Sequence, residues 1–209
     1  WADKQAKGEM TALGFDPARG GVDKSSSAPR HGQWFDKIIT APGIVTKDGP
    51  TAAAFVIPHV RNGACICVDS IGIGSSALDF LTGLNLNVLA VNGSEASAAI
   101  TKAGSLRYRN KRAEMYWRLR EALDPTSPDP IALPPDQELL GDLTAVRYKV
   151  VTMGKAAAIQ MRSKDEIREM LGRSPDKGDA VAMTFAVGVK PPNTRRDEYE
   201  SPPPPDWRM

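Results

Sequence analysis

The segment Cys65 to Ala77, CICVDSIGIGSSA, constrains the fold of this chain more than any other. Its first four residues are apolar and partly β-branched, Asn62-Gly63 precedes them, and glycines follow, which predicts a strand buried on both faces. Such a strand belongs in the interior of a sheet. Because side chains alternate along a strand, Asp69 should share a face with Cys65 and Cys67, at the strand end. A carboxylate there is costly to bury unless something binds it.

Two further carboxylates have comparable settings. The run from Met10 to Phe15 predicts a short strand, and Asp16 follows it at the start of a turn-rich segment. Ser174-Pro175 predicts a helix start with serine as the N-cap, and Asp179 lies among apolar residues of that helix, with Asp176 on the same face. Acids that converge in a core repel one another, and one or two divalent cations relieve that repulsion.

An alternative for these acids stays open from the pattern alone. Asp16 could form an Asx turn, Asp69 could cap a loop, and Asp179 could pair with Arg173 or Lys177.

The remaining pattern predicts an α/β chain in which short antiparallel strands come first and a β-α-β-α-β succession follows. A capping box at Ser163 to Glu166 opens a helix that stops at Gly172. The other expected elements are strands at 23–29 and 33–39, a helix at 51–60 interrupted by Pro58, a helix after Gly74, a strand at 87–91, helices at 109–123 and 136–143, and a hairpin of 146–152 with 156–161.

The glycines of the opening segment allow a rival interpretation. Gly72 to Ala77 matches G-x-G-x-x-A after a strand and before a helix, and Glu95 lies about 20 residues on, as in dinucleotide-binding sites. Two features count against it. Asp69 would repel a pyrophosphate, and the strand is the fourth in the chain, whereas the fingerprint usually follows the first strand of its unit.

Composition narrows the function classes. The formal charge of the 209 residues is only +2, so an anionic partner must be met by local clusters of Lys and Arg. No P-loop occurs, so we expect no ATP hydrolysis by this chain alone. Two cysteines, Cys65 and Cys67, indicate reduced thiols, and their spacing argues against a zinc site with His31 and His59. No apolar run approaches the length of a membrane span, and we expect no membrane partner.

One basic cluster precedes and enters the predicted helix at 109–123. With Tyr108 it could contact phosphates and stack on a base or sugar, although a solvated helix start explains it equally well. Basic side chains at a helix N-terminus oppose the macrodipole, which mildly favours a functional use. The candidate DNA-binding residues are Lys102, Arg107, Arg109, Lys111 and Arg112.

Five segments together resemble, in order and spacing, the C-terminal nuclease domain of tailed-bacteriophage terminase large subunits. They are VDSIGIGSSALDFL, VNGSEAS, YRNKRAEMYWRLREAL, LPPDQELLGDL and RSKDEIREMLGRSPDKGDAVAMTFA, and the similarity covers about residues 10 to 188. The resemblance implies an RNase H-like fold, a mixed β-sheet with antiparallel strands first and parallel additions after, flanked by helices. We therefore expect a linker at 1–9, the nuclease domain at 10–190 and a proline-rich tail at 191–209.

The same resemblance implies a site and a function. Asp16, Asp69 and Asp179 would be the catalytic acids and metal ligands, holding two Mg²⁺ or Mn²⁺ ions, with Asp23 and Asp176 as possible additional ligands. The activity would be endonucleolytic cutting of concatemeric double-stranded DNA during packaging, by two-metal-ion phosphodiester hydrolysis. The family's partners are the portal protein, the small terminase subunit and an N-terminal ATPase domain, which is absent from this chain. The location would be the cytoplasm of the bacterial host. A DNA-binding and docking module of the packaging motor, with little activity alone, is the alternative.

Overall fold

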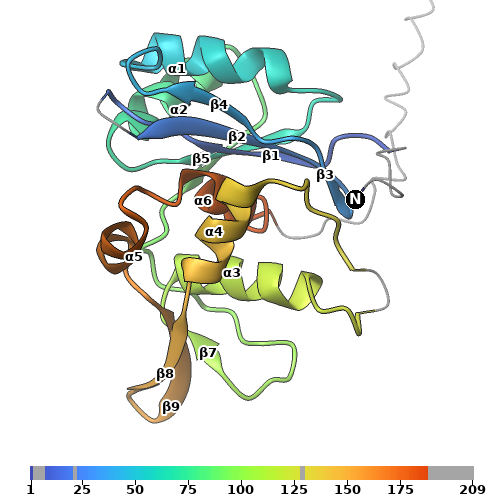
Figure 1. Ribbon diagram of the computed structural model, residues 1–209, viewed down its shortest axis with the longest axis vertical. Coiled ribbons are helices and arrows are strands. Elements are labelled where there is room, and N and C mark those ends of the chain that lie inside the picture. Colours follow the sequence, from blue (N-terminus) through green and yellow to red (C-terminus); the bar gives the residue numbers. More distant parts are fainter. Residues whose placement is uncertain (2–7, 21–22, 128–129, 188–209) are drawn as a thin grey trace, which may run out of the picture.

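A six-stranded mixed sheet forms the centre of the molecule (Figure 1). The computed structural model describes residues 1, 8–20, 23–127 and 130–187. The strands follow the order β3-β2-β1-β5-β6, and β4 also pairs with β2. Their bounds are β1 Ala12–Asp16, β2 Lys24–His31, β3 Trp34–Phe35, β4 Ile39–Pro42, β5 Cys65–Asp69 and β6 Val88–Val91.

The pairing divides this sheet into two halves. β2 runs antiparallel to β1, β3 and β4, whereas β5 runs parallel to both β1 and β6. Antiparallel strands come first in the chain and parallel strands are added afterwards, so the RNase H-like order expected from the resemblance is confirmed. β5 lies between β1 and β6, which also confirms the interior strand predicted from its unbroken apolar run.

Helices cover both faces of the sheet (Figure 1). On one face α1 (Gly49–Val56), continued by the 3₁₀ turn η1 (Ile57–His59), and α2 (Ile73–Gly83) pack over Leu13, Phe15, Ile66 and Val68. On the other face α3 (Lys111–Ala122), α4 (Gln137–Ala145) and α6 (Asp176–Met183) enclose a cluster that contains Cys67. Alternation along β5 places Asp69 on the same face as Cys67, as the sequence predicts, and this is the face that α6 covers.

A second, three-stranded sheet projects away from the first beyond α3 (Figure 1). Its order is β7 (Arg107–Tyr108), β9 (Ala156–Met161) and β8 (Tyr148–Met153), and β8 and β9 form the expected hairpin. β9 leads directly into α5 (Lys164–Leu171). The capping box of α5 is present, because Ser163 accepts a hydrogen bond from the Glu166 amide and the Glu166 carboxylate accepts one from the Ser163 amide. Gly172 ends the helix in a left-handed conformation at φ 69°.

Two predicted helix starts are corrected. α6 begins at Asp176 with Pro175 as its N-cap, and the first helical bond runs from the Asp179 amide to the Pro175 carbonyl at 2.9 Å, so Ser174 caps nothing. α3 begins at Lys111 and not at 109, because the Asn110 side chain accepts the Ala113 amide as an N-cap. The strand expected at 23–29 is present as β2, with Ser25 to Ser27 buried inside it.

The expected bounds of the linker, the nuclease domain and the tail remain untested. The linker at 1–9 falls largely outside the described residues, and the tail at 191–209 falls wholly outside them. The domain boundaries therefore stay predictions. In the described part of the chain, no helix is long and apolar enough to cross a membrane.

Candidate active site

Asp16 and Asp69 meet at one edge of the main sheet because the strands that carry them are parallel. Phe15 of β1 is in register with Val68 of β5, and the two aspartates follow this pair, one on each strand. The carboxyl ends of parallel strands share one edge of a sheet, where sites in α/β folds usually form. The first two predicted acids therefore lie side by side, at the position the sequence indicates.

Asp179 comes to the same edge from α6, which packs directly on β1. This approach depends on Gly14, since a Cβ atom at that position would lie 1.8 Å from the carbonyl oxygen of Ala180. The helix backbone thus touches the strand backbone one residue beyond Asp179 in the sequence. Asp16 and Asp179 are both buried, with 6% and 9% of their surface exposed, so neither acts as an ordinary solvated acid.

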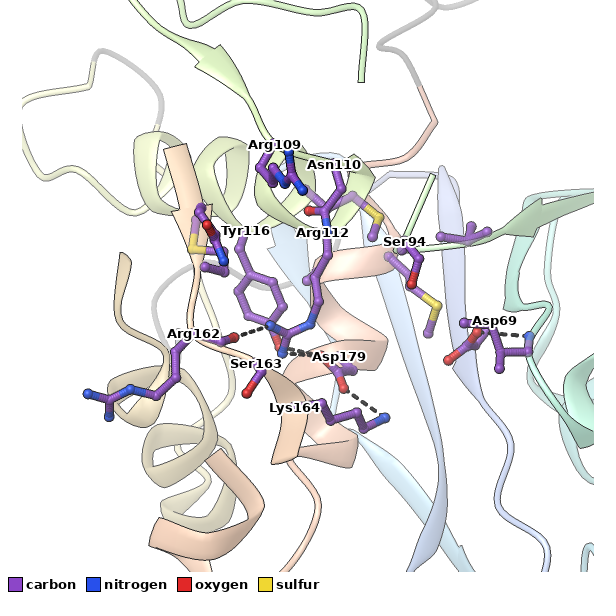
Figure 2. Close-up of a pocket in the computed structure, with 18 residues that line it drawn as sticks. Asp69, Ser94, Arg109, Asn110, Arg112, Tyr116, Arg162, Ser163, Lys164 and Asp179 are labelled. Atoms are coloured by element: carbon purple, nitrogen blue, oxygen red, sulfur yellow. Dashed lines mark hydrogen bonds and ion pairs between the residues drawn. The ribbon is translucent and has the colours of Figure 1, made fainter. Parts of the chain in front are cut away.

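Lys164, the first residue of α5, places its ammonium group between two of the acids. Its Nζ lies 3.0 Å from Oδ2 of Asp179 and 3.5 Å from Oδ2 of Asp16, and Figure 2 shows the side chain pointing at Asp179. Burial alone would lower the pKa of this lysine, but the neighbouring carboxylates of Asp16 and Asp179 raise it above the ordinary value. The ammonium is therefore charged and supplies a cation to the acid cluster.

The second oxygen of Asp179 is held by two other donors. The Tyr116 hydroxyl donates to Oδ1 at 2.6 Å, and Nη2 of Arg112 donates to the same atom at 3.2 Å (Figure 2). Arg112 also stacks over the Tyr116 ring at 4.8 Å and donates through Nη1 to the carbonyl of Arg162 at 2.9 Å. Asp179 consequently points Oδ1 into a fixed network and Oδ2 towards Lys164 and Asp16.

The three acids differ in their proton affinity. Burial raises the pKa of Asp16 well above its usual value, although Lys164 opposes the shift. Burial also raises the pKa of Asp69, against the hydrogen bond that its Oδ1 accepts from the Ile71 amide. Burial acts in the same direction on Asp179, but Arg112, Lys164 and Tyr116 hold its pKa below the usual value. Asp179 therefore keeps its charge to lower pH than Asp16 and Asp69, which take up protons more readily.

The donor chemistry of this edge suits a hard divalent cation. Carboxylate oxygens are the ligands that Mg²⁺ and Mn²⁺ prefer, and the Lys164 ammonium already sits where positive charge compensates Asp16 and Asp179. Among the described residues, no three Asp, Glu, His or Cys side chains are gathered closely enough to hold a metal ion as they stand. In this arrangement Asp16 and Asp179 share the Lys164 ammonium as their cation.

The two additional candidate acids lie next to this centre. Asp176 accepts the Lys24 amide at 3.0 Å, and Asp23 forms an ion pair with Arg168 of α5. The pKa of Asp176 is raised to about 6, mainly by burial and also by the charges of Asp23 and Asp179, against the Lys24 amide hydrogen bond and the charge of Lys164. Asp176 lies about one turn before Asp179 on α6, and the charges of both Asp23 and Asp179 act on it.

The predicted basic cluster divides into two groups. Lys102, Arg107 and Arg109 are exposed and can meet phosphates, whereas Lys111 pairs with Glu114 at 3.0 Å and Arg112 is bound to Asp179. Arg112 is therefore part of the acid network before any ligand arrives. The expectation that Tyr108 stacks on a base is wrong, because only 2% of its surface is exposed: its ring packs in a small cluster with Ala113 and Ile159.

The glycine motif after β5 has a packing role. A Cβ atom at Gly74 would lie 1.5 Å from the carbonyl oxygen of Asp69, so the start of α2 touches the end of the strand. Gly72 adopts a left-handed φ of 63°. These contacts explain both glycines without a bound nucleotide, which weakens the dinucleotide interpretation.

A cavity of about 400 Å³ opens beside the acids (Figure 2). One end is formed by Asp69, Lys164 and Asp179, and the other by Arg109 and Asn110 at the start of α3. Between them the lining includes Ser94, Tyr116 and the last residues of β9. The candidate active site is thus a concave surface that continues well beyond the acids.

Three functional side chains were not predicted from the sequence, namely Lys164, Arg112 in its acid-binding role, and Tyr116. Lys164 stands inside a capping box, where a solvated lysine is the ordinary expectation. Tyr116 lies on the apolar face of α3 and resembles a core residue. One signal was available: Arg112 and Tyr116 are four apart on a helix, a spacing that brings a guanidinium and a phenol together.

No protein-family model matches the sequence, and no curated protein matches it. Solved structures do match. The nuclease domain of the large terminase subunit gp2 of bacterial virus Sf6 has a TM-score of 0.67 at 23% identity, over 88% of this chain and 91% of that chain. A point mutant of the same domain, with manganese and beta-thujaplicinol, also has a TM-score of 0.67, at 22% identity over 90% and 92% of the two chains.

A more distant match is the large terminase nuclease from thermophilic phage G20c with bound magnesium. Its TM-score is 0.53 at 13% identity, over 85% of this chain and 81% of that chain. The structure therefore has the fold of phage terminase nuclease domains, which confirms the resemblance seen in the sequence. At these identities the likeness establishes the fold alone.

Proposed function

We propose that this chain is the metal-dependent endonuclease domain of a phage DNA-packaging terminase. The observation that carries the proposal is the pairing of Asp16 and Asp179 with one lysine ammonium, at the sheet edge where β5 ends in Asp69. Buried carboxylates that lie together need a compensating cation. A divalent cation bound by them can also activate water and stabilise the leaving oxygen in phosphodiester hydrolysis. Supporting it, the solved neighbours with this fold are terminase nucleases, described with manganese and with magnesium.

Each protein group has a distinct task in this proposal. Bound Mg²⁺ or Mn²⁺, as two ions, would activate water and stabilise the leaving oxygen. Asp69, half-buried at the strand end, and Asp16 supply ligand oxygens. Asp179 supplies Oδ2, because its Oδ1 is occupied by Tyr116 and Arg112. Lys164 neutralises the acids in the resting state and must move aside, and the exposed Arg109 contacts phosphates of the substrate strand.

The resting geometry also favours the second candidate function, a DNA-binding and docking module with little activity alone. Lys164 satisfies two of the three acids, so a metal must compete with an internal cation. If contacts with the rest of a packaging motor are needed to withdraw Lys164, the separate domain binds DNA and cuts it poorly. Portal protein, small terminase subunit and an ATPase domain would then be the partners, in the cytoplasm of the host cell.

The decisive experiment compares plasmid cleavage in Mn²⁺ by the parent and by Asp69→Asn. Asn retains the oxygen that accepts the Ile71 amide but loses the charge, so the fold should persist. We expect cleavage to fall by at least about a hundredfold, since even groups that only support metal ligands cost ten- to a hundredfold when removed. Asp79→Asn, on the exposed side of α2, is the matched control and should cut like the parent.

The outcomes separate the two candidates. Cleavage by the parent that Asp69→Asn abolishes supports the nuclease. A gel shift with DNA in EDTA, combined with no cleavage in Mn²⁺, favours the docking module. Equal cleavage by the parent and Asp69→Asn would show that the acids are not the active site.

A further inference from the structure

The cavity beside the acids has a chemistry that phosphate binding alone does not require. Its volume of about 400 Å³ lies within the range of small-molecule sites, roughly 300–1,000 Å³. A phosphodiester group held by metal ions would need only the end of the cavity that Asp69, Lys164 and Asp179 form, called the acid end below. The rest of the cavity extends from Asp69 and Asp179 to Arg109 and Asn110 (Figure 2).

The wall between these two ends is largely apolar and adaptable. Met115 of α3, Met161 of β9, and Ala182 and Met183 of α6 contribute to it. Thioether side chains fill irregular gaps and make favourable contacts with aromatic rings. A flat, weakly polar ring fits such a wall, whereas a hydrated phosphate does not.

Polar groups are spaced along the rim of this wall. Ser94, on the loop after β6, and Gln160, near the end of β9, line the cavity. The side-chain carbonyl oxygen of Asn110 accepts the Ala113 amide at the start of α3. Its side-chain NH₂ group remains available as a hydrogen-bond donor. Groups that combine donors and acceptors can bond the edge of a nucleobase.

The charges fall at the ends of the cavity. At the acid end, Lys164 and Arg112 are already bound to Asp16 and Asp179. At the other end, Arg109 is exposed and, within the described residues, no carboxylate lies within ion-pair distance of it. A DNA strand that crosses the site would therefore find one phosphate position at the acids and a second at Arg109, with an apolar wall between them.

We propose that this cavity is a binding site for one nucleotide of the substrate strand, next to the scissile phosphate, with its base unstacked against the methionine wall. The inference rests on the proposed nuclease function and adds the chemical class of the ligand, a deoxynucleoside 5′-monophosphate unit. A base inside an intact duplex cannot enter a side cavity, so the enzyme must pull one nucleotide out of the stack. Unstacking costs free energy, and the cost is least for unpaired bases.

The test fills the cavity and measures a single nucleotide. Ser94→Phe places a ring at the cavity wall from an exposed position whose backbone amide bond to Asn92 is unaffected by the side chain. Ala96→Phe is the matched control, exposed on the same loop but outside the lining. Titration calorimetry in Mn²⁺ compares deoxyadenosine 5′-monophosphate with inorganic phosphate for the parent and both variants, after circular dichroism has shown that both fold.

We expect the parent to bind the nucleotide at least about tenfold tighter than inorganic phosphate. Ser94→Phe should remove this difference while leaving phosphate affinity unchanged, and Ala96→Phe should preserve it. Equal affinity of the parent for both probes, or equal effects of the two Phe variants, would overturn the inference.

Plasmid cleavage by the same preparation separates the inference from the proposed function. Cleavage without nucleotide preference means that the cavity proposal is wrong and the nuclease stands. Nucleotide preference that Ser94→Phe removes, without cleavage in any divalent metal, means that the nucleotide site stands and the nuclease proposal is wrong.

Discussion

The Tyr116 hydroxyl and the Asp179 carboxylate form a 2.6 Å hydrogen bond across 63 residues of sequence. This bond joins α3 to α6 and fixes the rotation of the Asp179 side chain, because the second oxygen is then aimed at Lys164. Burial raises the pKa of Tyr116 well above the usual value, and the charge of Asp179 adds to the shift. The tyrosine therefore remains a protonated hydroxyl donor at neutral pH.

Tyr116→Phe removes this donor and little else. A hydrogen bond to a charged group contributes about 1.5–3 kcal/mol, so the free energy of unfolding in EDTA should fall by about that amount in urea titrations. Cleavage in Mn²⁺ should fall by about ten- to a hundredfold, as expected when a group that orients a metal ligand is lost. Tyr148→Phe, on the exposed face of β8, is the control and should change neither quantity. Parent-like cleavage by Tyr116→Phe would mean that Asp179 needs no such anchor.

Lys164→Met tests whether the ammonium competes with the metal. Methionine keeps the length of the side chain and removes its charge, so Asp16 and Asp179 lose the cation they share. Uncompensated buried acids repel. The variant should be less stable than the parent in EDTA, and its affinity for Mn²⁺ by titration calorimetry should rise by about tenfold or more, equivalent to about 1.4 kcal/mol.

The matched control for this change is Lys177→Met. Lys177 also has two carboxylate partners, Asp136 at 2.6 Å and Glu138 at 2.9 Å, but away from the acid cluster. Its loss should leave Mn²⁺ affinity unchanged. If Lys164→Met binds Mn²⁺ no better than the parent, the ammonium does not occupy the position of a metal.

Asp176 should make the stability of the metal-free protein depend on pH. Its pKa is about 6 in the folded protein against an ordinary value of 3.8, so between these values the folded state keeps a proton that the unfolded state releases. The stabilisation is complete below pH 3.8 and is lost as the pH rises through 6. Asp176→Asn, neutral throughout, should therefore melt close to the parent at pH 4 and above it at pH 7 in EDTA. A melting-temperature difference that stays constant between pH 4 and 7 would contradict this assignment.

The strand ends were predictable from the sequence because their signals are local. Apolar runs that stop at Asp16 and Asp69 mark strand ends within a few residues, and parallel pairing then brings the two acids to one edge. The roles of Lys164 and Tyr116 were not predictable, because each is defined by a partner on another element. A lysine in a capping box and a tyrosine on an apolar helix face have ordinary roles by default, and only the packing of α3, α5 and α6 against one another changes them. The prediction for Tyr108 was wrong for the converse reason, because a functional role was expected where the side chain only packs. Its basic neighbours suggested an exposed ring, but the pairing of β7 with β9 buries it.

Gly14→Ala should separate the acids without touching any of them. The added methyl group would lie 1.8 Å from the Ala180 carbonyl oxygen, and since that atom belongs to a helix backbone, α6 as a whole must move away from β1. Asp179 would then retreat from Asp16. We expect a loss of at least about 1–3 kcal/mol in the free energy of unfolding, the usual cost of overpacking a core, together with weaker Mn²⁺ binding in calorimetry below the melting transition.

Gly83→Ala is the control, because no atom lies within 4 Å of the place that its new methyl group would take at the end of α2. This variant should keep Mn²⁺ affinity and match or slightly exceed the stability of the parent. Undiminished Mn²⁺ affinity in a folded Gly14→Ala protein would show that the spacing between β1 and α6 does not set the geometry of the acids.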